Sequence, residues 1–414
     1  MKDDPKVSII ITAHNYERWL EESVRSALSQ TWQNVEVIIV DDGSDDNTPQ
    51  MLKAYSDLEN VKCLRLEKVG LASACNAGIA VSTGDLLIRL DADDFFDENL
   101  VLVLATYLAN HVDVDAVYSD YFTVDEDGSF LSVERRMRLG DELKVLDRPA
   151  LGASIMYRRA LYLKIGGYDE SLSYQEDYDF WLGLIREGNI NNINLPLWYY
   201  RKHASSMSRN FDKRMQSRQI VKKKHVNEQN INIGEGLAII LIDDINLRDE
   251  NISTVAYKNT SLLEHCIKTV GQSELISKII VCGNAAARAH TEKLGLNFIE
   301  TQGSMNNLKL FDDIIPVIRD AFSAISHKSN FICSISPRVP FLSAHHLDEA
   351  INTLAIFNTD AVIAVAPAIG QYWRPGIDGL VPHNSTFSEL NIESEMIYNS
   401  VLGFSALRLE KLLP

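Results

Sequence analysis

Residues 86–94 read Leu86-Leu87-Ile88-Arg89-Leu90-Asp91-Ala92-Asp93-Asp94, an apolar run that ends in three carboxylates. Carboxylates at the end of a buried strand lose hydration and repel one another unless a cation or a hydrogen-bond donor is present. Hard oxygen ligands of this kind suit Mg2+ or Mn2+, held partly by protein and partly by a phosphate-bearing ligand. The stretch therefore predicts a buried strand that delivers acidic side chains to a divalent cation.

The segments around this stretch alternate between strand and helix patterns. Such alternation predicts an α/β fold with a mixed, mainly parallel sheet that has helices on both faces. Ligands of such sheets bind beyond the carboxyl ends of the strands. The predicted strands are 7–11, 35–40, 61–66 and 85–90, and the predicted helices are 17–30, 48–56 and 71–81. Polar loops at 12–15, 41–44 and 91–94 should then meet on one rim of the sheet.

Composition limits the class of protein. A chain of 414 residues should form two or three domains. It has no apolar run near the roughly 20 residues of a membrane-spanning helix, and its polar start, Met1–Pro5, does not resemble a signal peptide. Five scattered cysteines without a Cys-x-x-Cys pair favour free thiols in a reducing cytoplasm. The formal net charge of −17 argues against nucleic-acid binding.

One segment departs from this acidic balance. Between Arg201 and Lys224 there are nine Lys or Arg residues and a single acid, Asp212. One interpretation is a solvated helix face. The other is a surface that meets anionic lipid headgroups or a diphosphate-linked acceptor, which would place the protein peripherally at the inner membrane face.

A polar stretch divides the chain into two parts. The composition of residues 227–236 is typical of a linker. We therefore expect a first domain at 1–226 and a second at 237–414, since the pattern of an apolar run, a polar turn and a helix starts again near Leu237.

Several motifs in the first domain, in order and at family-like spacing, resemble family 2 glycosyltransferases. The resemblance covers about residues 5–210, and the matching segments are Val7–Tyr16, Asp41–Ser44, Asn76–Gly78, Gly84–Asp85, Leu90–Asp94, Gly166–Asp169 and Glu176–Asp177. It implies a GT-A fold, a nucleotide-sugar donor such as a UDP-hexose, a glycan or lipid-linked acceptor, and Mn2+ or Mg2+ as cofactor.

The same resemblance implies roles for single residues. Asp93 and Asp94 would face the metal, as would His203 near the diphosphate. Asp177 would be the general base, with Glu176 beside it in the catalytic pair. The residues implied in nucleotide-sugar binding are Thr12, His14, Asn15, Asp41, Asp42, Lys68, Asn76, Asp91 and Ala92.

Each of these assignments has a structural alternative. The Asp-rich turn can simply cap the next helix, and His203 can be a surface histidine. Glu176 and Asp177 can favour a helix N-terminus through its dipole. Phe180 and Trp181 can wall a sugar cleft or belong to the core. Lys68 and Arg89 are weaker candidates for the diphosphate.

The second domain resembles cytidylyltransferases that activate acidic sugars, again through scaffold segments. These include Leu237–Ile240, Lys278–Cys282, Ser336–Leu342 and Thr359–Val365. The loop Ile242–Glu250, however, lacks glycine and carries four acids against one Arg248. Such a loop repels a triphosphate, so we expect a domain without transfer activity. It ends at Pro414, before that family's usual end, and so is shortened or truncated.

The leading hypothesis is a metal-dependent inverting glycosyltransferase of surface polysaccharide synthesis. The alternatives are a non-catalytic nucleotide- or glycan-binding protein and a bifunctional enzyme with an active cytidylyltransferase domain. A glycosidase, which also uses two carboxylates, ranks low because it leaves the Asp41–Ser44 turn without a role. The sequence leaves the donor sugar, the acceptor and the oligomeric state open.

Overall fold

The structure, a computed structural model, describes residues 4–136, 154–204, 211–242, 253–301, 311–323, 329–367, 373–376, 379–382, 390–392 and 398–409. The chain divides into two compact units. Unit 1 comprises Met1–Arg218 and Gly370–Met396, and unit 2 comprises Gln219–Ile369 and Ile397–Pro414.

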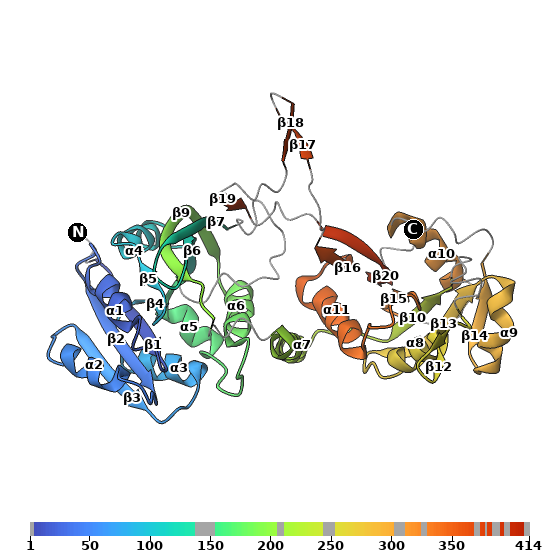
Figure 1. The fold of residues 1–414 in the computed structure, drawn as a ribbon, viewed down its shortest axis with the longest axis horizontal. Helices are drawn as coiled ribbons and strands as arrows, with labels where there is room; N and C mark the ends of the chain where they lie inside the picture. Colours follow the sequence, from blue (N-terminus) through green and yellow to red (C-terminus); the bar gives the residue numbers. More distant parts are fainter. Residues whose placement is uncertain are drawn as a thin grey trace. The chain divides into compact units, whose positions relative to one another are not determined.

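Unit 1 is built on one mixed sheet with the order β19-β7-β6-β8-β4-β1-β2-β3, in which β9 pairs with β5 and β6 (Figure 1). Strand β1 pairs in parallel with β2 and β4, and β2 pairs in parallel with β3. Strand β8 lies next to β4 and runs antiparallel to it. The strands are β1 (Val7–Ala13), β2 (Val35–Asp42), β3 (Val61–Leu66), β4 (Leu86–Asp91), β5 (Phe95–Phe96), β6 (Ala116–Val124), β7 (Phe130–Arg135), β8 (Met156–Arg158), β9 (Ile190–Arg201) and β19 (Leu390–Ile392). A separate pair is formed by β17 (Trp373–Gly376) and β18 (Gly379–Pro382).

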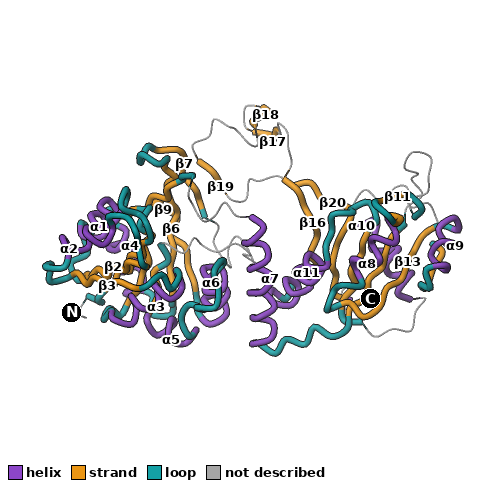
Figure 2. Tube along the Cα trace, turned by 60° about the horizontal axis from the view of Figure 1, so that its bottom comes forward, coloured by secondary structure: helices purple, strands orange, loops and turns teal. Residues whose placement is uncertain are grey.

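Helices cover both faces of this sheet, as the alternating sequence pattern predicted. Figure 2 shows α1, α2 and α4 on one side and α3 and α5 on the other. Alternate residues of β1 therefore serve two cores: Ile9 and Ile11 pack with α1 and α4, whereas Ile10 faces Gly78 of α3. This explains why the strands are continuously apolar. The helices are α1 (Leu20–Leu28), α2 (Thr48–Tyr55), α3 (Leu71–Val81), α4 (Leu100–Asn110), α5 (Arg159–Ile165), α6 (Glu176–Glu187) and α7 (Phe211–Glu228).

Two elements differ in length from the sequence-based expectation. Helix α1 begins at Leu20 rather than near residue 17, because Asn15 adopts a positive φ of 60° and the chain first makes a turn closed on the carbonyl of Tyr16. The sequence also predicts a strand at Leu197–Arg201. Strand β9 includes it but starts earlier, at Ile190. Its polar first half is held by parallel pairing with β6, so tertiary pairing overrides low strand propensity.

A buried carboxylate links β1, β2 and the segment before β4 at the end of the sheet opposite the polar rim. Glu36 on β2 accepts hydrogen bonds from Ser8 of β1 (2.7 Å), from Lys6 (3.1 Å) and from the Gly84 amide before β4 (3.1 Å). Burial alone would raise the pKa of Glu36, but these hydrogen bonds and those from Thr83 outweigh it and lower the pKa to about 2.

We expect Glu36→Gln to destabilise the protein by roughly 2–3 kcal/mol at pH 7, because a carboxylate with a depressed pKa stabilises the fold above its unfolded-state pKa. The difference from wild type should shrink as pH falls from about 4.5 towards 2. Urea midpoints at pH 7, 4 and 3 measure it. Exposed Glu59→Gln is the control, and an equal effect of both changes would contradict the prediction.

Unit 2 is a second α/β unit with the sheet order β14-β13-β10-β15-β20-β16. The first four strands are parallel, and β20 runs antiparallel to both β15 and β16. Residues of β10 alternate between two cores, with Ile240 packing with α8 and α11, and Ile239 with α10. The elements are β10 (Gly236–Leu241), β11 (Ala256–Tyr257), β12 (Thr260–Ser261), α8 (Leu262–Val270), β13 (Ile276–Gly283), α9 (Ala285–Lys293), β14 (Asn297–Glu300), α10 (Phe311–Ser323), β15 (Phe331–Ile335), α11 (Ala344–Phe357), β16 (Ala361–Pro367) and β20 (Tyr398–Arg408).

The division between the units lies within α7, between Arg218 and Gln219, rather than in the predicted linker 227–236. Residues 370–396 also return to unit 1, where β19 pairs with β7. A division of the sequence into two contiguous domains could not assign residues 370–396 to the first unit. The acidic loop of the second domain falls at residues 243–250, outside the described residues.

Candidate active site

The carboxyl ends of β1, β2 and β4 lie side by side, so the three polar loops meet on one rim as predicted. The strand register pairs Thr12 with Val40 on one side and with Asp91 on the other. The Thr12 carbonyl also accepts a hydrogen bond from the Ala92 amide at 3.2 Å. Ala92 itself is fully buried, so its side chain supports the rim and does not offer the predicted ligand contact.

The loop after β2 is shaped by its two aspartates. Asp42 accepts hydrogen bonds from the amides of Val69 (2.6 Å) and Gly70 (2.9 Å), just before α3. Asp41 is fully buried and accepts a hydrogen bond from the Ser44 amide at 2.9 Å. One oxygen of Asp41 thus holds the turn, and its contact with a nucleotide stays a prediction. Both oxygens of Asp42 fix the segment before α3 and not the next helix, α2, and its contact with a nucleotide stays a prediction.

The neighbouring predicted donor contacts occupy the same edge of the rim. The Nδ1 atom of half-buried His14 lies 2.7 Å from the carbonyl oxygen of Asp42. Asn15 joins the two loops, because its amide donates to Ser44 Oγ (2.9 Å) and its side chain accepts from the Asp45 amide (2.8 Å). Lys68 has a positive φ of 48° and lies against Gly43. His14 and Lys68 thus stay candidates for nucleotide binding, and Asn15 acts as a loop connector.

Asn76 has a different role from the predicted one. Its Nδ2 donates to the Tyr168 carbonyl (2.9 Å) and to Glu170 (2.8 Å), and its Oδ1 accepts from Tyr162 Oη (2.8 Å) and the Tyr168 amide (3.0 Å). All four hydrogen-bonding positions of the side-chain amide are thereby used within the protein. Asn76 anchors the turn at Gly166–Asp169 and is not placed to bind a donor.

A buried arginine ties the acidic cluster to the second pair of carboxylates. Arg89, on β4, is 3% exposed, and its Nη2 donates to Asp91 Oδ2 and to Asp177 Oδ2, each at 3.1 Å. Its Nη1 bonds to Asp177 Oδ1 as well. Arg89 and Asp91 lie two residues apart on one strand and therefore on one face. That spacing could have revealed their pairing, but nothing in the sequence indicated that Asp177 would join them.

The two members of the predicted catalytic pair point in different directions. Asp177, at the start of α6, keeps its side chain 26% exposed while it binds Arg89. Glu176 is buried, and burial together with the Asp177 charge raises the pKa of Glu176 to about 7. The site therefore contains one partly exposed carboxylate that is held by a cation and one buried carboxyl that is easily protonated. Of this pair, Asp177 is the member that solvent reaches.

The three acidic side chains at 91–94 also lie in different environments. Burial raises the pKa of Asp91 to about 6, with Asp93 and Asp177 adding to the effect and Arg89 opposing it. Asp94 is 2% exposed and its Oδ1 accepts from the Arg201 amide at 2.9 Å. Burial, Asp93 and Asp91 raise its pKa well above the usual value. Asp94 is thus buried and bonded within the protein, and its position facing a metal stays a prediction.

Asp93 and His203 form the part of the cluster that is suited to a cation. His203 Nε2 lies 2.8 Å from Asp93 Oδ2, and the His203 ring packs on Trp19 with centroids 4.5 Å apart. The His203 side chain is 1% exposed, so the surface-histidine alternative is wrong. Within the described ranges, no three or more His, Cys, Asp or Glu side chains converge as a metal site. Asp93 and His203 still fit as two protein ligands of a Mg2+ or Mn2+ ion. Phosphate oxygens would supply the remaining ligands, and the repelling carboxylates nearby favour a cation there.

Two further predictions about this region are corrected. Phe180 and Trp181 are 3% and 1% exposed, and Phe180 stacks on Tyr168 at 4.3 Å. They are core residues and do not wall a sugar cleft. In the described part of residues 201–224, Arg201 does not belong to a free basic surface, because it is buried and bonds to Glu22 (2.5 Å) and to the Asp93 carbonyl (2.8 Å).

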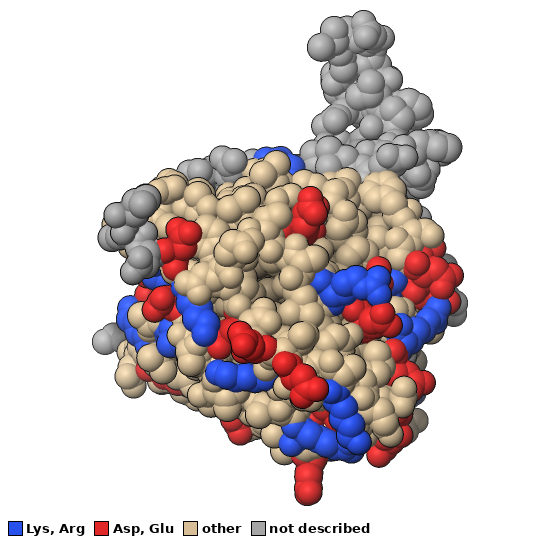
Figure 3. Space-filling model, turned by 90° about the vertical axis from the view of Figure 1, so that its left-hand side faces the viewer, with Lys and Arg blue, Asp and Glu red and all other residues tan. Residues whose placement is uncertain are grey.

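Three more cations of that segment have partners within the protein. Lys222 is 2% exposed and bonds to Glu349 at 3.2 Å, Lys223 pairs with Glu274, and Arg218 lies over the Tyr178 ring. On the face shown in Figure 3, basic and acidic side chains are interspersed. The predicted contact with anionic lipid therefore has no exposed Arg201 or Lys222 to support it.

Comparison with known proteins shows which family residues 8–166 resemble. The model of glycosyl transferase family 2 matches residues 8–166. Residues 8–166 are similar to family 2 glycosyltransferases. Their match includes the rim and the acids at 91–94, whereas Asp177 and His203 lie beyond it.

Proteins similar to this glycosyltransferase domain occur in several bacteria. An uncharacterized glycosyltransferase of Rickettsia prowazekii is 34% identical over 209 residues, which is 49% of this chain and 65% of that protein. Chondroitin synthase of Escherichia coli is 28% identical over 50% of this chain and 30% of its own length. Glycosyltransferase GlyG of Streptococcus pneumoniae is 38% identical over 30% of this chain and 42% of its own length. The chain thus spans less than two thirds of each of these relatives.

Among solved structures, Staphylococcus aureus TarS 1–349 in complex with UDP-GlcNAc is 21% identical, with a TM-score of 0.44 over 54% of this chain and 67% of that chain. In the part of the chain that the structure describes, no helix is both long and apolar enough to cross a membrane. All five cysteines are free, as the sequence predicted.

Proposed function

We propose that unit 1 transfers a sugar from a nucleotide-sugar donor to a hydroxyl group of a glycan or lipid-linked acceptor, with inversion at the anomeric carbon. The observation that carries the proposal is the Arg89 bridge, which places Asp177 of α6 beside Asp91 at the end of β4. The family 2 match over residues 8–166 supports the reaction class. The similarity to a chondroitin synthase supports a polysaccharide product.

The residues of the site divide the chemistry between them. His14, Lys68 and the rim near Thr12 bind the nucleotide, and Asp91 accepts a hydrogen bond from a hydroxyl group of the donor. Asp177 takes the proton of the acceptor hydroxyl as its oxygen attacks the anomeric carbon and the bond to the diphosphate breaks. Asp93 and His203 would hold a Mg2+ or Mn2+ ion, which supplies Lewis-acid stabilisation of the leaving diphosphate.

Binding of UDP with and without Mn2+ tests the donor half of the proposal. A ligand at one hundred times its Kd stabilises a protein by about 2.7 kcal/mol. We expect UDP to raise the melting temperature mainly when Mn2+ is present, and Asp93→Asn to lose the Mn2+-dependent part. Exposed Asp57→Asn is the matched control. A UDP shift that is independent of Mn2+, or that is unchanged in Asp93→Asn, would contradict the metal assignment.

A non-catalytic binding protein is the second candidate. The arrangement favours the enzyme, because a binding module has no need for a partly exposed Asp177 held next to a repelling carboxylate cluster. For unit 2 we propose a nucleotidyltransferase-like domain without transfer activity. Its parallel strands β14-β13-β10-β15 support a nucleotide-binding type of sheet, and the acidic composition of residues 242–250 argues against triphosphate binding.

A further inference from the structure

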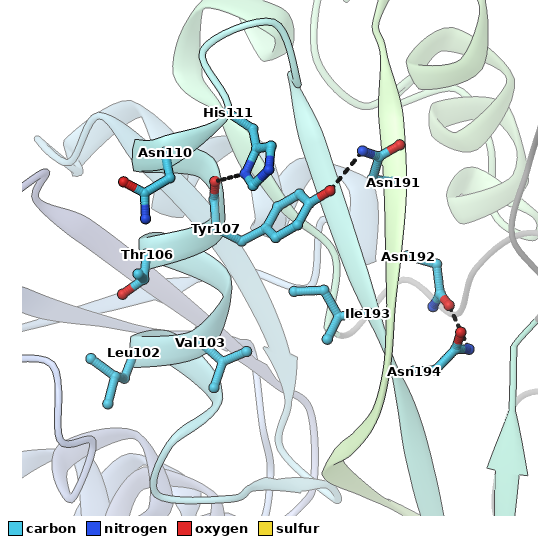
Figure 4. Close-up of a pocket in the computed structure, with 10 residues that line it drawn as sticks. All are labelled: Leu102, Val103, Thr106, Tyr107, Asn110, His111, Asn191, Asn192, Ile193 and Asn194. Carbon is cyan, nitrogen blue, oxygen red and sulfur yellow. Dashed lines mark hydrogen bonds between the residues drawn. The ribbon is translucent and has the colours of Figure 1, made fainter.

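A groove of about 790 Å3 lies in unit 1 between α4 and β9, away from the rim (Figure 4). Its lining comes from α4 side chains between Leu102 and His111 and from Asn191 to Asn194 of β9. Strand β9 reaches the rim at Arg201, which contacts the Asp93 carbonyl. At about 3.3 Å per residue, Asn194 lies roughly 20 Å along the strand from Arg201. A monosaccharide at the rim therefore cannot occupy the groove.

The side chains that line the groove favour one class of ligand. None of the ten lining residues is Asp, Glu, Lys or Arg. Exposed Thr106 and Asn110 offer hydroxyl and amide groups, and amides both donate and accept hydrogen bonds. Leu102, Val103 and Ile193 add an apolar surface beside them. This mixture matches a neutral sugar, whose hydroxyls need both donors and acceptors and whose C–H face is apolar, and it offers no cation for a phosphate or a uronate.

The aromatic part of the groove is fixed before any ligand arrives. Tyr107 and His111 stack with their ring centroids 4.1 Å apart and a tilt of 17°. The Tyr107 hydroxyl accepts a hydrogen bond from Asn191 Nδ2 at 2.8 Å, and His111 Nδ1 lies 2.8 Å from the Tyr107 carbonyl (Figure 4). Side chains that are already ordered lose little entropy on binding. The pair thus forms a rigid platform with the His111 ring on its exposed side.

We propose that this groove binds a segment of a neutral oligosaccharide, as a site separate from the catalytic rim. The choice of a glycan rests on the proposed function, because a transferase that extends a glycan gains by holding the acceptor chain at a second point. Such a contact raises the effective concentration of the chain end at the rim without taking part in the reaction.

A single charged substitution tests the groove on the full chain. Calorimetric titration with chitohexaose should show binding to the wild type and at least tenfold weaker binding to Thr106→Arg, whose side chain fills the groove. Ala109→Arg, exposed on the same helix but outside the lining, is the matched control and should bind as the wild type does. Melting curves confirm that both variants fold.

The outcomes separate this inference from the proposed function. Donor hydrolysis should be unchanged in Thr106→Arg, and Asp177→Asn should still bind chitohexaose. No binding by the wild type, or equal binding by Thr106→Arg, would overturn the groove while leaving the transferase proposal intact. Binding of a uronate-containing hexasaccharide as tight as that of chitohexaose would overturn its preference for neutral glycans.

Discussion

Asp177→Asn should lower the rate of sugar transfer by about 10²–10⁴-fold, the contribution that a positioned general base typically makes. The amide keeps the size of the carboxylate and can still accept a hydrogen bond from Arg89, so the fold should persist. It cannot take the acceptor proton. We expect kcat to fall while the KM for the donor changes little, since Asp177 touches the acceptor and not the nucleotide.

The measurement is release of nucleoside diphosphate from the sugar nucleotide that a hydrolysis screen of the wild type selects. Glu187→Gln, at the other end of the same helix, is the control and should retain wild-type turnover. A rate for Asp177→Asn within tenfold of the wild type would remove Asp177 from the role of base. The proposal would then need another acceptor of the proton.

Arg89→Met should reduce the free energy of unfolding by about 3–5 kcal/mol, the usual cost of removing one partner from a buried ion pair. Arg89 is 3% exposed and neutralises both Asp91 and Asp177. Methionine fills a similar volume but leaves two neighbouring carboxylates without a counter-charge. The repulsion should also displace Asp177, so transfer should fall together with stability.

Urea unfolding of Arg89→Met measures the loss, with Arg25→Met as the control. Arg25 makes an exposed ion pair with Glu21 one helical turn away, and such pairs contribute less than about 1 kcal/mol. The double variant Arg89→Met/Asp177→Asn should regain part of the stability, because one of the two repelling charges is gone. Equal losses for Arg89→Met and Arg25→Met would show that Arg89 does not act as the bridge.

The positions of the three polar loops could be predicted, because they follow from the local pattern of apolar and polar residues. Apolar strands that alternate with helices give a parallel sheet, and the carboxyl ends of such strands share one rim. The loops at 12–15, 41–44 and 91–94 were therefore correctly brought together from sequence. The register that pairs Thr12 with Asp91 shows how closely they meet.

The functions of individual acids on that rim could not be predicted in the same way. Asp41, Asp42 and Asp94 have the composition of ligand-binding residues, but their oxygens accept hydrogen bonds from backbone amides of the protein. Which donor a carboxylate meets depends on the path of loops and strands that are distant in sequence. The sequence carries no local signal for such contacts.

By itself, the sequence determined the class of sheet, the rim on which the polar loops meet and the start of α6 at Glu176. Only the tertiary structure decided that Arg89 joins Asp91 to Asp177, that Asp93 pairs with His203, and that Arg201 and Lys222 are buried. The physical reason is that periodicity records which face of an element is apolar. The partner of a buried charge is set by the packing of segments far apart along the chain.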